Sequence, residues 1–201
     1  MKRGPFNPDS PFWKLIGEFG ELLILSLMWF LGALPLVTFG ASTVALYDTV
    51  VHCIRNQESD IFGRFWYTYK RELGLSVPCS VLWLGVIVGS FLLYRRYTDV
   101  AGTSQAAYVT AIAWIVLQIA VLGIACWVGP IQSRFTFRFG DLTGTAIKLA
   151  IAHIGITILL GLGTAISIWL CFRFILPVMI LPGIVILFWT VLMEPIFQKY
   201  M

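Results

Sequence analysis

The sequence predicts an all-α fold, a polytopic membrane helix bundle of about five transmembrane helices with interfacial amphipathic helices, forming one domain over residues 1–201. Composition is the first observation behind this prediction. Hydrophobic residues make up 59% of the chain and charged residues only 12%, whereas soluble domains average roughly 25% charged. The second observation is that the apolar residues gather in charge-free runs near the ~20 residues that a membrane helix needs. A water-soluble domain and a β-sheet are therefore not expected.

Five charge-free runs are the predicted transmembrane helices. They are Leu22 to Phe39, Leu75 to Tyr94, Ala106 to Val128, Leu149 to Leu170 and Phe174 to Met193. Residues 1–21 form a proline-rich tail and an interfacial approach, in which Trp13 suits headgroup depth. Arg173 is the only charge between the last two runs, so that connection is expected to be very tight. Pro177 and Pro182 predict a bend within the fifth helix.

Between the first two runs, residues 43–73 carry two amphipathic patterns at helical spacing. The apolar positions of the first are Tyr47, Val50, Val51 and Ile54. Those of the second are Phe62, Phe65, Trp66 and Tyr69. Ser42 or Thr43 can cap the first helix, and Asp60 can cap the second. Because cations occupy the other faces, we expect both helices to lie on the membrane surface.

Aromatic and basic side chains predict a partner surface on one side of the membrane. Five spans place the loop after the third run, with its Arg134, on the same side as residues 43–73. The candidate partner surface is therefore Phe62, Phe65, Trp66 and Arg134. That side also holds more Lys and Arg, which predicts an outside N-terminus and a cytoplasmic C-terminus. The same pattern would equally serve helices packed on their own bundle and the lipid surface.

Polar groups inside the runs form a candidate intramembrane site. His153 lies in the fourth run and Gln118 in the third, and such groups need a partner or a wet cavity. A single hydrogen bond to a neighbouring helix would also satisfy His153. Small residues around Gly85 and Gly161 predict close helix packing. Glu194, before Pro195, is interpreted as a group at the membrane boundary.

The sequence contains no catalytic, cofactor-binding or metal-binding pattern, so we expect no enzyme activity and no cofactor. It has no Walker loop, no His-Glu-x-x-His and no Gly-x-Ser-x-Gly. Its four cysteines lie far apart without a Cys-x-x-Cys pair. The net charge of +4 is spread over several loops, which favours contact with a lipid bilayer and not with nucleic acid. The oligomeric state is not readable.

Several blocks of sequence resemble the YesL family, a bacterial family of small multi-pass membrane proteins also described as domain of unknown function 624. The blocks are Leu34 to Tyr47, Phe65 to Arg71, Trp127 to Phe135, Pro182-Gly183 and Leu192 to Tyr200. The chain departs from the pattern at Gly129, where an aromatic residue is expected. The resemblance implies a cell-membrane protein encoded beside carbohydrate uptake transporters, and it supplies no catalytic or binding residues.

Three functional classes follow from these observations. The first is an accessory component of a carbohydrate uptake system that contacts the transporter subunits. The second is a stand-alone small-solute transporter or channel, in which His153 and Gln118 would line a path. The third is a structural or lipid-organising membrane protein that uses the basic interfacial helices.

Overall fold

The computed structural model describes residues 11–56, 58, 60–101, 105–174 and 176–199, and these residues form helices and short connections without a strand. The elements in chain order are α1 (Pro11–Ala33), η1 (Leu36–Thr38), α2 (Phe39–Thr49), the π-helix η2 (Val50–Arg55), α3 (Ile61–Ala101), α4 (Gln105–Arg134), α5 (Phe139–Ala152), α6 (Ile154–Arg173), η3 (Leu176–Met179) and α7 (Leu181–Phe197). The predicted all-α fold class is confirmed.

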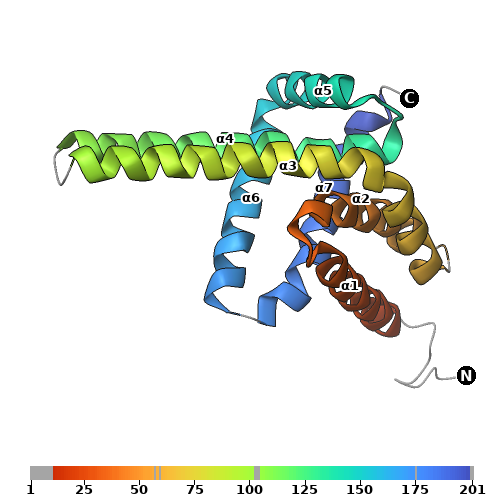
Figure 1. The fold of residues 1–201 in the computed structure, drawn as a ribbon. Helices are drawn as coiled ribbons and strands as arrows, with labels where there is room; N and C mark the ends of the chain where they lie inside the picture. The colour runs from red at the N-terminus through yellow and green to blue at the C-terminus, as the bar shows by residue number, and fades with distance from the viewer. Residues whose placement is uncertain (1–10, 57, 59, 102–104, 175, 200–201) are drawn as a thin grey trace, which may run out of the picture.

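The helices form a body from which one hairpin projects (Figure 1). In the body, α2 packs against α1, α3, α4 and α7. The C-terminal half of α3 and the N-terminal half of α4 run side by side away from the body, and we call this hairpin the α3–α4 arm (Figure 1). Its side chains, such as Phe91, Leu93 and Val116, are 46%, 74% and 61% exposed. An apolar surface of this kind suits a lipid environment.

Contrary to the prediction, α2 lies in the core of the protein and not on the membrane surface. In the stretch Leu36–Arg55, 67% of the residues are buried, against 28% or less in the other four helices long and apolar enough to span a membrane. Ser42 and Thr43 lie within α2, which begins at Phe39, so neither caps it. The amphipathic pattern was read correctly as a helix, but its polar face meets charged groups of α3 instead of lipid headgroups.

The second predicted surface helix is the first part of α3, which continues without a break into the second predicted span. Asp60 does cap this helix, since its Oδ1 accepts a hydrogen bond from the Gly63 N–H at 2.9 Å. The 41 residues of α3 have a length along the helix of roughly 60 Å, about twice the thickness of the hydrocarbon core, and this helix, which contains Pro78, is bent (Figure 1). The charged first turns, around Arg64 and Arg71, are the part expected to lie outside that core.

Among the described residues, five helices are long and apolar enough to cross a membrane, as predicted, but they are not the same five. The stretch Leu36–Arg55 joins the set. Residues 11–21 belong to α1 and form no separate interfacial element, while residues 1–10 lie outside the described part of the chain. In the predicted fifth span, Pro177 lies in the 3-10 turn η3 and Pro182 in the first turn of α7. The predicted bent helix is therefore a turn followed by a 17-residue helix.

Helix α7 begins where it does because α1 supplies its cap. The Ser26 hydroxyl, which is fully buried, accepts a hydrogen bond from the Gly183 N–H at 2.9 Å. A side chain at Gly183 would meet Ser26 Oγ at 2.7 Å and the Leu22 carbonyl at 2.9 Å. Pro182 lacks the N–H that the first turn would leave unpaired. Capping and close approach thus fix α7 against α1.

The predicted fourth span is broken at His153, whose backbone (φ −121°, ψ 50°) separates α5 from α6. The Thr157 hydroxyl compensates for the break, because it donates to the Ala150 carbonyl at 2.8 Å and accepts from Trp127 Nε1 at 3.0 Å. Farther along α6, a side chain at Gly161 would collide with the Ile119 carbonyl of α4, which confirms the predicted close packing there.

At the other predicted small-residue face, around Gly85, close packing within the chain is not found, and a contact between chains stays a prediction. Nothing lies within 4 Å of the space that a side chain at Gly85 or Gly89 would take. Both residues lie in the C-terminal half of α3, the half that belongs to the arm. These glycines leave open surface there and do not mediate contact between the two helices of the arm.

Candidate functional site

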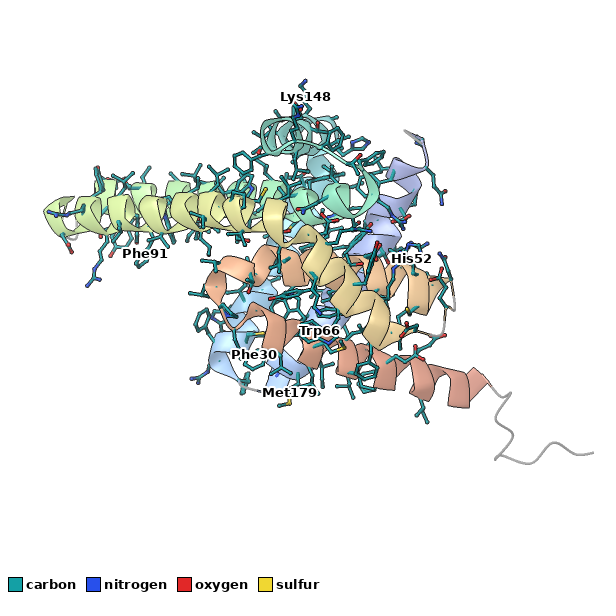
Figure 2. All side chains as sticks on the ribbon, turned by 45° about the vertical axis from the view of Figure 1, so that its right-hand side comes forward. Phe30, His52, Trp66, Phe91, Lys148 and Met179 are labelled. Atoms are coloured by element: carbon teal, nitrogen blue, oxygen red, sulfur yellow. The ribbon has the colours of Figure 1, made fainter. Side chains whose placement is uncertain are left out.

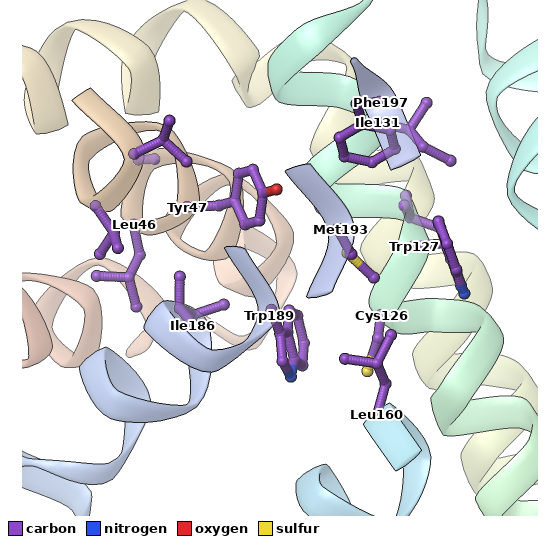
Figure 3. Close-up of a cluster of buried hydrophobic side chains, with 14 of the residues drawn as sticks. Leu46, Tyr47, Cys126, Trp127, Ile131, Leu160, Ile186, Trp189, Met193 and Phe197 are labelled. Carbon is purple, nitrogen blue, oxygen red and sulfur yellow. The ribbon is translucent and has the colours of Figure 1, made fainter. Parts of the chain in front are cut away.

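Two polar clusters flank α2, one on each side. Successive residues of an α-helix point about 100° apart, so Tyr47 and Asp48 face different neighbours. Tyr47 points from α2 toward α7, near Met193 and Trp189 (Figure 3). Asp48 instead contacts α3. Both residues are buried, at 0% and 3% exposure.

The first cluster, the Glu194 cluster, consists of Tyr47, Arg134 and Glu194 and joins α2, α4 and α7. The Tyr47 hydroxyl donates to Glu194 Oε1 at 3.1 Å. Arg134 donates to the same oxygen from Nε at 3.0 Å and from a terminal nitrogen at 2.8 Å. The side chains of Arg134 and Glu194 are 15% and 9% exposed. One carboxylate oxygen thus holds three helices together through a largely buried ion pair.

The second cluster, the Asp48 cluster, consists of Asp48, His52, Glu58, Arg64 and Thr68. Asp48 Oδ2 accepts hydrogen bonds from Arg64 Nε at 2.7 Å and from the Thr68 hydroxyl at 2.8 Å. His52 lies between two carboxylates, with Nε2 3.6 Å from Asp48 and Nδ1 3.1 Å from Glu58. The cluster ties α2 and η2 to the start of α3. It is formally neutral only when His52 carries a proton.

The π-helix η2 links the two clusters to α7. Its wide turn is seen in the hydrogen bond from the Asn56 N–H to the Val51 carbonyl at 3.1 Å. Within it, the Arg55 guanidinium donates to the Thr190 carbonyl at 2.8 Å. Thr190 precedes Glu194 by about one helical turn. The two basic side chains of η2 are therefore both held by the protein: His52 belongs to the Asp48 cluster, and Arg55 binds α7.

A further polar contact fastens α4 to α3. The Gln132 amide donates to Glu72 Oε2 at 2.8 Å and to the Ser76 hydroxyl at 2.9 Å. The Gln132 Oε1 atom on the other side of the same amide is buried without a hydrogen-bond partner in the described structure. Among the described residues, no group of three or more His, Cys, Asp or Glu side chains could hold a metal ion.

Of the four residues predicted to form a partner surface, only two lie on the surface. Phe65 is fully buried, and Arg134 is committed to the Glu194 cluster. Phe62 and Trp66 are 57% and 41% exposed, and Tyr67 beside them is 62% exposed. We call Phe62, Trp66 and Tyr67 the aromatic patch (Figure 2 labels Trp66). Phe65 faces the core of the protein, and its helical spacing from Phe62 and Trp66 does not reveal this.

The two predicted intramembrane polar residues have separate partners and do not form one site. Gln118 donates its amide to the Ser90 hydroxyl in the α3–α4 arm. His153 lies at the junction of α5 and α6, with its ring 6.0 Å from that of Trp127. Its Nδ1 is buried and has no hydrogen-bond partner within the described structure. The predicted interhelical bond is thus present for Gln118 and not for this nitrogen of His153.

Sequence reasoning missed the role of Glu194, which it placed at the membrane boundary. Glu194 is 7% exposed and carries the central carboxylate of its cluster. A signal was available, because Glu194 is the only acidic residue of α7, and an ionisable group in such an apolar helix requires a partner. The sequence did not indicate which of the distant arginines and tyrosines would supply it.

Five long apolar helices around a core with paired charges indicate a multi-pass helical membrane protein. Residues 22–97 match the model of a family described as "Protein of unknown function, DUF624". The predicted resemblance to the domain of unknown function 624 family is confirmed over these residues, which run from α1 into the α3–α4 arm. The name YesL stays a prediction. Comparison with curated proteins and with solved structures found no match.

Proposed function

We propose that this protein is an accessory membrane component of a bacterial carbohydrate uptake system, which acts by contact with the transporter subunits and catalyses no reaction. The link to carbohydrate uptake rests on the family resemblance, which implies genes beside such transporters. The physical support is the aromatic patch. Large aromatic side chains are enriched at protein interfaces and often contribute most of the binding energy.

The position of the aromatic patch fits a contact outside the hydrocarbon core. Phe62, Trp66 and Tyr67 lie in the first two turns of α3, among Arg64, Lys70 and Arg71. The Arg71 guanidinium lies 5.5 Å from the centre of the Tyr67 ring, so a cation borders the patch. With the N-terminus outside, α1 crossing the membrane and the buried stretch Leu36–Arg55 not crossing it, the patch would face the cytoplasmic side of the transporter.

The polar groups of the core favour this proposal over a stand-alone transporter. In the Glu194 and Asp48 clusters, the charged side chains bond to one another. Gln118 is likewise bonded to Ser90. A transport path needs polar groups that exchange partners with a solute, whereas these groups connect helices of the same chain.

The proposal is tested by isolating the tagged protein in mild detergent and identifying its partners by mass spectrometry. We expect transporter subunits to be recovered with the native protein. Replacing Phe62, Trp66 and Tyr67 together by alanine should lower the recovery about tenfold or more, since each truncated interface aromatic costs on the order of 1–2 kcal/mol.

The matched control removes two exposed aromatic side chains from the arm, by Tyr97→Ala with Tyr108→Ala. These residues are 46% and 67% exposed, and they lie far along the chain from the aromatic patch. The control should recover the transporter as the native protein does. If no transporter subunit is recovered, and the purified protein alone moves solute across liposomes, the stand-alone transporter reading replaces the proposal.

A further inference from the structure

A groove opens beneath α5, between the C-terminal ends of α4 and α7. Its walls are apolar, and its volume is about 410 Å³. This volume falls in the range of small-ligand pockets, roughly 300–1,000 Å³. Its lining consists of the partly exposed Phe135, Phe137 and Leu149 over the fully buried Ile131 and Phe197, and we call this cavity the α5 groove. Most of its surface thus suits hydrocarbon and offers little to a sugar.

The polar groups of the α5 groove are few and are donors. Lys148 lines it and is exposed, and Figure 2 shows this residue at the outer face of α5. Its ammonium makes no ion pair within the described part of the chain. Thr145, one turn earlier, adds a hydroxyl to the lining. No carboxylate belongs to the lining, so Lys148 is its one charged residue.

The groove lies where helices of the bundle become polar. Helix α4 ends at Arg134 after a long apolar stretch, and α7 ends just before Gln198 and Lys199. The two ends are fixed to each other by the bond between Arg134 and Glu194. Such a change from apolar to charged residues marks the level of the lipid headgroups in a membrane helix. An occupant of the groove would therefore have its polar end at that level.

We propose that the α5 groove is a binding site for an anionic phospholipid, with acyl carbon packed on the aromatic walls and the phosphate against the Lys148 ammonium. Charge complementarity selects this occupant, because an anionic lipid brings net negative charge to the cation, whereas the phosphate of a zwitterionic lipid is offset by its own ammonium group. A basic residue near the membrane surface attracts an anionic lipid with about 1 kcal/mol, which corresponds to roughly fivefold in affinity. The site lies apart from the aromatic patch, so the proposal is independent of transporter docking.

The experiment is native mass spectrometry of the full chain purified with equal amounts of phosphatidylglycerol and phosphatidylcholine. We expect the protein to retain phosphatidylglycerol over phosphatidylcholine by about fivefold. Lys148→Ala should remove the preference. Lys70→Ala, which removes an exposed lysine on α3 outside the groove, should keep it. Ala152→Trp, which fills the groove, should lower the retention of both lipids.

Three results would overturn the lipid site. The first is equal retention of the two lipids by the native protein. The second is an equal loss of preference in Lys148→Ala and Lys70→Ala, since that would assign the effect to general surface charge. The third is undiminished lipid retention by a monodisperse Ala152→Trp variant. If this variant fails to fold, the comparison of the two lysine variants still decides the proposal.

Discussion

Removing Arg134 should destabilise the protein far more than removing an exposed arginine. The side chains of Arg134 and Glu194 are only 15% and 9% exposed, so Arg134→Met leaves a buried carboxylate without its cation. Losing one partner of a buried pair costs about 3–5 kcal/mol in the free energy of unfolding. Arg71→Met is the control, because the Arg71 side chain is 45% exposed and its partner Glu72, 14% exposed, would keep the hydrogen bond from Gln132. It should cost about 1 kcal/mol or less.

The second part of this prediction is that the pair is coupled. Glu194→Gln removes the buried charge but keeps an oxygen that can accept the Tyr47 hydroxyl. The double variant Arg134→Met with Glu194→Gln should therefore be more stable than Arg134→Met alone, by about 2 kcal/mol or more. Unfolding by SDS titration from mixed micelles, followed by tryptophan fluorescence, measures these differences. A loss in Arg134→Met no larger than in Arg71→Met, or simple additivity of the two changes, would refute the reasoning.

Three further predictions concern packing, capping and topology. Gly161→Val should cost several kcal/mol in unfolding free energy, because the new side chain meets the α4 backbone, whereas Gly85→Val should be nearly neutral; equal effects in the same SDS titration would contradict this. Ser26→Ala should cost about 1 kcal/mol through loss of the α7 cap, and an unchanged unfolding midpoint would argue against that cap. Single cysteines at Asp60 and Lys199 should react with a membrane-impermeant maleimide from the same side, the cytoplasmic one; labelling from opposite sides would rule out the topology.

The sequence predicted the features that depend on local chemistry. Composition and charge-free runs indicated a helical membrane bundle, and the cap at Asp60 and the close packing at Gly161 were both found. A cap depends on residues three positions apart, and close packing on small side chains, so both can be read from short segments. These predictions needed no knowledge of which helices become neighbours.

The predictions that failed depend on which helix packs against which. The pattern around Tyr47 is equally amphipathic whether Asp48 faces water or Arg64, and only the fold supplies Arg64. The same holds for Phe65, which is buried one position before the exposed Trp66. The break at His153 is stabilised by a threonine on the next helix turn and a tryptophan on another helix. Such partners come from distant sequence, which hydropathy does not reveal.

In-cell photo-crosslinking at two adjacent positions of α3 tests the docking proposal most directly. A photoreactive phenylalanine analogue replaces Trp66, which is 41% exposed, or Phe65, which is fully buried. The account predicts that position 66 crosslinks to a subunit of a carbohydrate transporter and that position 65 crosslinks only within the chain. Failure of position 66 to capture a transporter subunit, with the protein inserted at its normal level, would contradict the account.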